Sequence, residues 1–201
     1  MKRTASVPVL LLSLLAGCKS HPLTDYRPLD KAGMWSSTME DLKKLNVNDA
    51  EIAQLVALKN AGVSDEMCLS LVQAAHDHQH AFVSAASAAS LNRAGFPDVQ
   101  ILDIARNDQL DALSGDAVML RLIGLSDPSV QLILQRRMKK LTTLSSAEIG
   151  RLKNTGLSEK EIVARIQSGM TDAQADAEAA AREHARAHSG TGFVRVHGRR
   201  R

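Results

Sequence analysis

The segment Leu58-Lys-Asn-Ala-Gly62-Val-Ser-Asp-Glu-Met-Cys68 returns near the other end of the chain as Leu152-Lys-Asn-Thr-Gly156-Leu-Ser-Glu-Lys-Glu-Ile162. Between these segments, the same pattern surrounds Gly95 and Gly124. Each of the four glycines has a leucine four residues before it, an apolar residue directly after it and an acid three residues after it. The glycines are spaced 33, 29 and 32 residues apart. Agreement in so many columns indicates an internal repeat, and this repeat determines the expected fold.

One repeat predicts two helices joined by a tight turn. A helix that ends at a glycine can use the left-handed backbone conformation, and the apolar residue that follows packs back on that helix. The acid lies in the first turn of the second helix, where the positive end of the helix dipole favours it. Serines two residues after three of the glycines are placed to cap the second helix: Ser64, Ser126 and Ser158. Three pairs have the spacing of a capping box: Asn48 with Glu51, Ser145 with Glu148, and Ser158 with Glu161.

We therefore expect an all-α domain over residues 37–170, made of four short helical-hairpin repeats packed into one compact array. Helices of this length are marginal alone in water, so neighbouring units must supply the core. An open solenoid and a closed globule both satisfy this need, and we favour the compact form. Of the 201 residues, 44% are hydrophobic but only 2% are aromatic, so the core must be aliphatic. This composition excludes a fully disordered chain, a collagen-like chain and a polytopic membrane protein.

The start of the chain has the features of an export signal. Lys2 and Arg3 precede a nine-residue apolar run from Val7 to Leu15, which is shorter than the ~20 residues that a membrane-spanning helix needs. The run leads into Leu15-Ala16-Gly17-Cys18, which resembles the lipobox of bacterial lipoproteins. The resemblance implies that residues 1–17 are a signal peptide that is removed. It also implies that the thiol of Cys18 receives diacylglycerol.

The resemblance also implies a location. Several acyl chains hold a protein on a membrane far more firmly than one chain does. In this class an Asp after the acylated Cys retains the protein in the inner membrane, and here that position is Lys19. We therefore expect an outer membrane lipoprotein that faces the periplasm, or a protein on the outer face of the plasma membrane where the envelope has one membrane. Residues 18–36 are interpreted as a lipidated tether, and Cys68, left without a partner, is expected to be buried in the core.

The charges are unevenly distributed. The chain as a whole carries a formal charge of +3, but from Arg182 to the end there are six arginines against one acid. Residues 171–201 are expected to form an alanine-rich helix, capped by Thr171 with Gln174, followed by a basic tail. The helix lacks a large apolar stripe, so we expect it to project into solvent. The tail suggests contact with an anionic surface through its last arginines, with a second basic patch at residues 136–140. These arginines are Arg199, Arg200 and Arg201.

Three kinds of chemistry are conceivable for the mature chain. The spacings of His76 with His80 and of His184 with His188 suggest two histidine pairs on helix faces, which together offer four nitrogen ligands to Zn²⁺ or Cu²⁺. The turns also resemble the helix-hairpin-helix of DNA-binding proteins. However, the second glycine of that motif is replaced by serine or proline, and an acid that repels phosphate comes next, so we expect no nucleic-acid binding. No catalytic motif for acyl transfer, metalloproteolysis or phosphate binding is present.

The sequence therefore predicts a non-enzymatic, membrane-anchored envelope lipoprotein that acts as a protein-interaction or structural module. Its expected partners are a membrane, through Cys18, and an envelope protein or a second copy of the chain. No cofactor and no bound metal are expected. Two alternatives remain open at this point: a periplasmic metal-binding protein that uses the histidine pairs, and an enzyme without a familiar motif.

Overall fold

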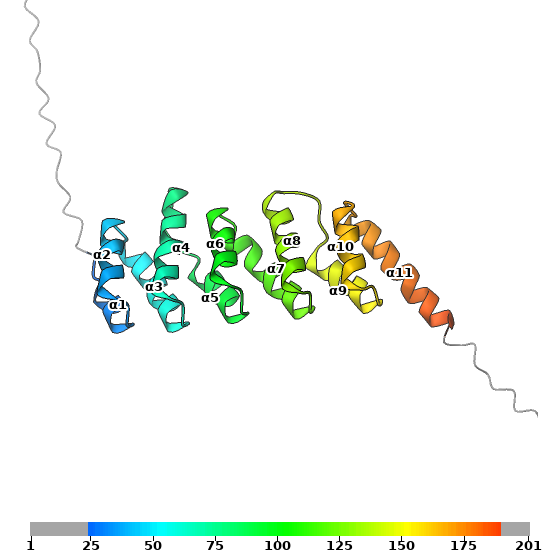
Figure 1. Ribbon diagram of the computed structural model, residues 1–201, viewed down its shortest axis with the longest axis horizontal. Coiled ribbons are helices and arrows are strands. Elements are labelled where there is room, and N and C mark those ends of the chain that lie inside the picture. Colours follow the sequence, from blue (N-terminus) through cyan, green and yellow to red (C-terminus); the bar gives the residue numbers. More distant parts are fainter. Residues whose placement is uncertain (1–23, 190–201) are drawn as a thin grey trace, which may run out of the picture.

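The computed structural model describes residues 24–189, and in this range the regular structure is entirely helical (Figure 1). The expectation of an all-α repeat array is confirmed. One layer contains the odd-numbered helices: α1 (Arg27–Lys31), α3 (Asp49–Asn60), α5 (Ala85–Arg93), α7 (Leu110–Leu122), α9 (Ser146–Asn154) and α11 (Asp172–Ser189). The other layer contains the even-numbered helices: α2 (Ser36–Lys44), α4 (Asp65–Asp77), α6 (Asp98–Arg106), α8 (Asp127–Met138) and α10 (Glu159–Gln167).

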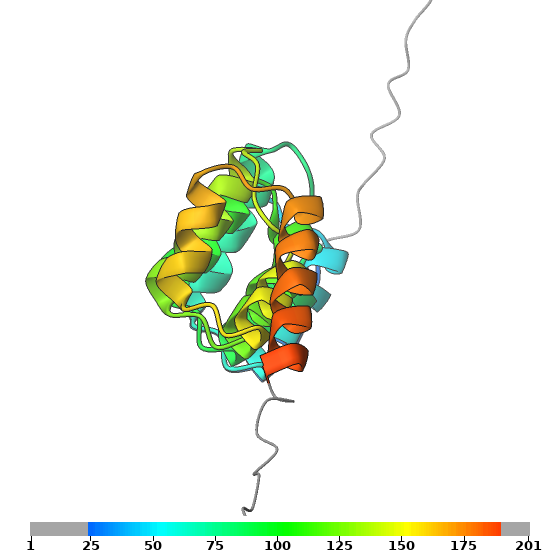
Figure 2. The same ribbon diagram turned by 90° about the vertical axis from the view of Figure 1, so that its right-hand side faces the viewer.

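The helix pairs stand side by side in one row (Figure 1). Each odd helix packs against the next odd helix, from α1 with α3 through to α9 with α11, and the even helices do the same in α2 with α4, α4 with α6, and α8 with α10. Seen along the row, the helices of each layer fall largely behind one another (Figure 2). The packing is compact between neighbouring pairs, but the row is open and its two ends do not close into a globule. The core lies between the layers and is almost wholly aliphatic.

Within residues 24–189 the array contains five units and not four. The unit that was not predicted surrounds Gly33, with Leu29 four residues before it and Met34 directly after it, both buried. Trp35 and Ser36 replace the serine or proline and the acid of the other units, so only part of the pattern is present. Because α1 begins at residue 27, the second half of the expected tether belongs to the array. The boundary predicted at residue 37 was therefore wrong.

Helix α11 also differs from expectation. It does not project into solvent, because it packs along α9 as the last helix of the odd layer. Ala175 and Ala179 are fully buried and lie one turn apart on one face, so small side chains replace the expected large apolar stripe. The predicted cap is present: Thr171 Oγ1 accepts the N–H of Gln174, and Gln174 Oε1 accepts the N–H of Thr171.

The four predicted glycine turns have the predicted geometry, and the turn at Gly33 shares it. The glycines have φ between +77° and +91°, and the N–H of the next residue donates to the carbonyl of the leucine four residues before the glycine, at 3.0–3.3 Å. This is the Schellman arrangement, in which a left-handed residue ends the helix. Four even helices end without glycine but in the same arrangement. The N–H of the left-handed residue donates to the carbonyl three residues before it, and the N–H of the next residue donates to the carbonyl four residues before the left-handed residue. Their left-handed residues are Asn46, Gln79, Asp108 and Lys140, with φ of 53–63°.

Candidate functional site

The two long edges of the array are built differently. We call the edge with the five glycine turns the turn edge. The opposite edge, which carries the connections from each even helix to the next odd helix, is called the loop edge. Its segments are residues 45–48, 78–84, 107–109, 139–145 and 168–171.

At the turn edge, acids join neighbouring units. Asp65 is almost fully buried, and its carboxylate accepts the N–H of Trp35 from the preceding unit at 2.6 Å while pairing with Lys59. In the same way, Glu159 accepts the N–H of Ser126 at 3.1 Å, together with the Ser126 hydroxyl. From the sequence, these acids were expected to have only a helix-dipole role. The capping role expected for Ser126 was wrong, because its hydroxyl donates to the next unit instead.

Cations at the same edge also contact the preceding unit, but they donate hydrogen bonds to it instead of accepting them. Arg121 Nη1 donates to the carbonyl of Ala94 at 2.6 Å, and Lys153 Nζ donates to the carbonyl of Gly124 at 2.5 Å. Arg186 of α11 repeats the contact on the last unit, donating to Asn154 O at 3.0 Å. The accepting carbonyls end the preceding odd helix, where they lack an intrahelical partner and carry the negative end of the dipole. Each cation therefore caps the helix of the unit before it.

These cations also explain why glycine is needed in three of the turns, and the closest approach is that of Arg186 to a Cβ added at Gly156. A Cβ added to Gly95 would lie 3.1 Å from Arg121 Nη1, and one added to Gly124 would lie 3.1 Å from Lys153 Nζ. A Cβ at Gly62 would meet nothing within 4 Å. Glycine therefore serves two needs at positions 95, 124 and 156: the positive φ and the space for the cation that follows in the row.

At the loop edge, Glu51 is the best-connected buried polar side chain. It is 2% exposed, and its Oε1 accepts the N–H of Phe82 at 2.9 Å and lies 2.7 Å from His76 Nε2. The predicted capping box with Asn48 is present, since Glu51 Oε2 accepts the N–H of Asn48 and Asn48 Oδ1 accepts the N–H of Glu51. Burial alone would raise the pKa of Glu51, but the N–H groups of Phe82 and Asn48 and the imidazole of His76 outweigh it, and the pKa is lowered. One carboxylate thus joins α3, α4 and the loop at residues 78–84.

A second polar group lies on the other side of that loop. His80 Nδ1 lies 3.1 Å from the carbonyl of Ala81 and His80 Nε2 lies 2.9 Å from Asp108, and these two acceptors raise the pKa of His80. The hydroxyls of Ser84 and Ser87 both donate to Asp111, at 2.9 and 2.6 Å. Hollows of about 360 and 210 Å³ flank the loop, and His80 lines both.

This group of side chains holds a loop in place and does not form a pair of a hydroxyl with an imidazole. Serine nucleophiles are commonly activated by an imidazole within hydrogen-bond reach. Here the hydroxyl of Ser84 is bonded to Asp111, while His80 is bonded to Asp108 and His76 to Glu51. Each imidazole therefore has a carboxylate partner instead of a nucleophile.

The histidine pairs are not brought together. Helix α4 ends at Asp77 and the chain turns at Gln79, so His80 lies beyond the helix and does not share a helix face with His76, as had been expected. His184 and His188 do share a face of α11, with ring centroids 4.1 Å apart, but they lie far along the row from α4 (Figure 1). Residues 24–189 contain no group of three or more His, Cys, Asp or Glu side chains placed to hold a metal ion.

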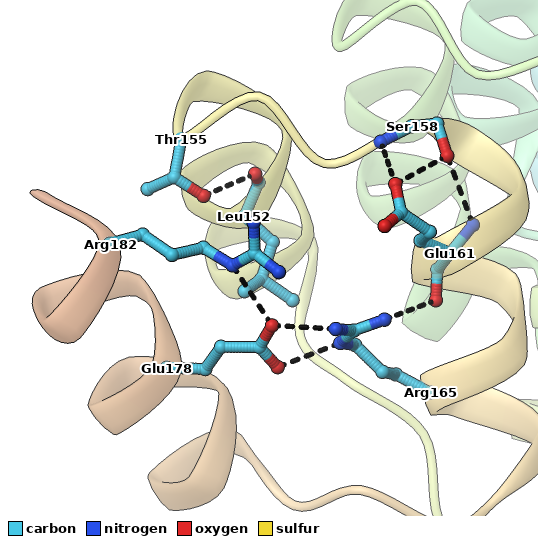
Figure 3. Close-up of polar contacts among 7 residues, drawn as sticks. All are labelled: Leu152, Thr155, Ser158, Glu161, Arg165, Glu178 and Arg182. Carbon is cyan, nitrogen blue, oxygen red and sulfur yellow. Dashed lines mark hydrogen bonds and ion pairs between the residues drawn. The ribbon is translucent and has the colours of Figure 1, made fainter. Parts of the chain in front are cut away.

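The last unit is joined to α11 by a group of charged side chains (Figure 3). Glu178 accepts two hydrogen bonds from Arg165, each 2.7 Å long, and one of 3.0 Å from Arg182. These arginines lower the pKa of Glu178. The capping box of Ser158 with Glu161 is formed as predicted. The polar side chains at this end therefore fix α11 as the cap of the row.

Two arginines of the predicted basic patch at residues 136–140 make contacts within the array. Arg136 donates to the carbonyl of Thr142 at 2.9 Å, and Arg137 pairs with Asp116 at 2.7 Å and donates to Leu144 O. Both arginines thus hold the loop at residues 139–145. Cys68 is fully buried as predicted, and burial raises the pKa of its thiol to about 12. The remaining predicted contact residues lie outside the described range: Cys18, Arg199, Arg200 and Arg201.

Two exposed apolar side chains share one face of α7. Met119 and Leu122 are 49% and 75% exposed and lie three residues apart. We call these two residues the α7 patch. At the position of Leu122 the other four units carry Lys31, Asn60, Arg93 and Asn154. The repeat therefore does not require an apolar side chain there.

Among residues 24–189, no helix is both long and apolar enough to cross a bilayer. The chain matches no known protein-family model, and no curated protein has significant sequence similarity to it. A function for this chain therefore has to rest on its own residues and on the geometry of the array.

Proposed function

We propose that the protein is a non-enzymatic lipoprotein of the cell envelope whose helical array binds another protein. The anchor is Cys18, in the lipobox-like segment Leu15-Ala16-Gly17-Cys18. Acylation there would attach the chain to the outer membrane, facing the periplasm, nine residues before α1 begins. The basic tail would add contact with an anionic surface through Arg199, Arg200 and Arg201.

The array has the properties of a binding scaffold. Stacked helix pairs offer an extended surface, because each unit contacts only its neighbours. The polar side chains at the unit boundaries bond to backbone groups and to one another, as Asp65 does to Trp35 and Glu51 does to Phe82. These groups account for the cohesion of the row and leave binding to the outer surface.

The α7 patch is the observation that supports protein binding most directly. Its two side chains are exposed in the fourth unit, where the corresponding positions of the other units are mostly polar or charged. Adjacent exposed apolar side chains can form part of an interaction site, and a few residues carry most of the binding energy in protein interfaces.

The proposal is tested by photo-crosslinking from two matched positions. A photoreactive amino acid replaces Leu122 in one variant and Asn60 in the other, because both side chains are exposed at the same position of the repeat. We expect one discrete crosslinked species from position 122 and none from position 60. In a separate Leu122→Glu variant, the protein identified in that species should no longer co-purify with the chain. Equal crosslinking from both positions, or from neither, would contradict the proposed interface. The anchor is tested separately with a fatty-acid label, whose incorporation should disappear in Cys18→Ala.

A further inference from the structure

Trp35 is the only tryptophan of the chain and the largest exposed apolar side chain of the first unit. It is 64% exposed at the N-cap position of α2, where the other units carry Ser64, Pro97, Ser126 and Ser158. We propose that Trp35 docks at the boundary between head groups and acyl chains of the membrane to which Cys18 is anchored. The inference rests on the proposed anchor and adds a second, non-covalent membrane contact made by the array itself.

The first unit is the end of the row nearest to the anchor. Arg27, where α1 begins, is nine positions after Cys18, so the covalent chain between them can reach at most about 32 Å. Helix α1 is only five residues long, which is about 7.5 Å along its axis. Trp35 comes directly after the turn that ends α1, so its indole ring lies within the reach that the tether allows.

The outer face of this unit is not built to receive a further repeat. Two inner units meet the preceding unit with an acid three residues after the glycine, Asp65 and Glu159. Two do so with a cation three residues before it, Arg121 and Lys153. In the first unit these positions are Ser36 and Asp30. Among residues 24–189 this unit is the first of the row (Figure 1), and its outer face carries neither of these groups for contact with a further unit.

The backbone of Trp35 is held rigidly while its ring is exposed. Its N–H donates to the buried carboxylate of Asp65 at 2.6 Å, which fixes the turn against the second unit. An indole ring combines an apolar body with one N–H donor, and this combination is favoured at membrane–water interfaces. A ring presented on a rigid turn loses little conformational freedom when it docks.

The surrounding charges indicate that the contact is apolar and not electrostatic. Residues 24–48 carry four acids and four bases, and three of the bases are paired within the unit: Arg27 with Asp25, Lys43 with Glu40, and Lys44 with Asp41. A neutral surface gains little from anionic lipids. Docking of Trp35 should therefore be insensitive to salt, unlike any contact made by the basic tail.

The experiment uses the mature chain, residues 18–201, coupled through the thiol of Cys18 to a maleimide lipid in phosphatidylcholine vesicles. Coupling is selective because Cys68 is buried and its thiol has a raised pKa. Some of the phosphatidylcholine carries bromine on its acyl chains, which quenches nearby indole emission. We expect the emission of Trp35 to shift to the blue and to lose most of its intensity, equally in low and in high salt.

The matched control moves the single tryptophan along the row. The double variant Trp35→Ser with Leu122→Trp places the probe at a 75% exposed position of the fourth unit. It also gives position 35 the serine that three other units carry at the corresponding position. Its emission should be neither shifted nor quenched. Equal quenching of the two probes, or no quenching of Trp35, would overturn the inference. Because the anchor is attached chemically, these outcomes do not depend on whether cells acylate Cys18, which the fatty-acid label decides separately.

Discussion

The turn edge and the loop edge of the array solve the same problem in different ways. Each edge must end five helices and join neighbouring units. The turn edge does so with five glycines at positive φ and with cations and acids that recur from unit to unit. The loop edge uses mostly non-glycine residues at positive φ, loops of different lengths and one buried carboxylate, Glu51. The repeating edge is therefore the one that a sequence pattern reveals, and the irregular edge carries the contacts that are specific to one position.

The largest effect is expected at the loop edge, from Glu51→Ala. The change leaves the N–H groups of Phe82 and Asn48 without their acceptor and removes the partner of His76. We expect a loss of about 3–4 kcal/mol in the free energy of unfolding, as is usual when one partner of a buried polar group is deleted. Urea denaturation followed by circular dichroism measures it.

The control is Glu66→Ala, which removes another acid from the first turn of a helix. Glu66 is exposed, so its loss should change the free energy of unfolding by no more than about 0.5 kcal/mol. If the two substitutions had the same effect, Glu51 would be acting only through the helix dipole. That result would contradict the claim that the buried carboxylate of Glu51 joins α3, α4 and the loop at residues 78–84.

At the turn edge, the comparison of Gly124→Ala with Gly62→Ala separates the two roles of glycine. Both positions have φ near +80°, which costs an alanine about 1–2 kcal/mol. At Gly124 the new Cβ also lies 3.1 Å from Lys153 Nζ and displaces its capping bonds, which adds about 1 kcal/mol.

Thermal unfolding of the two variants and of Lys153→Met provides the measurement. In Lys153→Met the capping bonds are already absent, so Gly124→Ala should cost no more there than Gly62→Ala costs in the parent chain. A penalty at Gly124 that is independent of Lys153 would show that the cation does not contribute to the need for glycine.

These comparisons also show what could be read from the sequence. The glycine turns, the capping boxes of Asn48 and Ser158 and the burial of Cys68 were predicted because each depends on residues that are close in the sequence. The first unit was missed because Trp35 and Ser36 replace the residues that define the pattern. The burial of α11 was missed because Ala175 and Ala179 pack by close approach of two helices, which leaves no large apolar stripe to detect.

The contacts of the candidate site were harder to predict. The link between Glu51 and Phe82 spans 31 residues and depends on how the loop at residues 78–84 folds back. The residue type alone indicated a capping role for Glu51, and this role was correct but incomplete. His76 and His80 had the spacing of a helix face, yet α4 ends between them, because Gln79 adopts a left-handed conformation that the sequence does not favour.

The pH dependence of stability should also depend on the loop edge. The pKa of Glu51 is lowered in the folded state, so the stabilisation by its carboxylate is fully present above its ordinary pKa of 4.5 and is lost as the pH falls from that value through the lower folded-state pKa. The urea midpoint of the parent chain should therefore fall more steeply below about pH 5 than that of Glu51→Gln, which cannot ionise. Parallel curves would show that Glu51 is not ionised differently in the folded and unfolded chains.

The smallest effect is expected from Gln79→Gly, and it has the opposite sign. Gln79 ends α4 at φ +63°, a conformation that costs a side chain with a Cβ about 1–2 kcal/mol but costs glycine nothing. Part of this gain is offset because glycine also makes the unfolded chain more flexible, so a net stabilisation of about 0.5–1 kcal/mol is expected. Asn46→Gly is the matched control at φ +55°, where the gain should be smaller because asparagine tolerates the left-handed region. Equal gains would mean that the strain at the loop edge does not depend on the side chain. A loss at Gln79 would mean that its side chain makes a contact that outweighs the strain, and the loop edge would then be as well adapted to its irregular residues as the turn edge is to glycine.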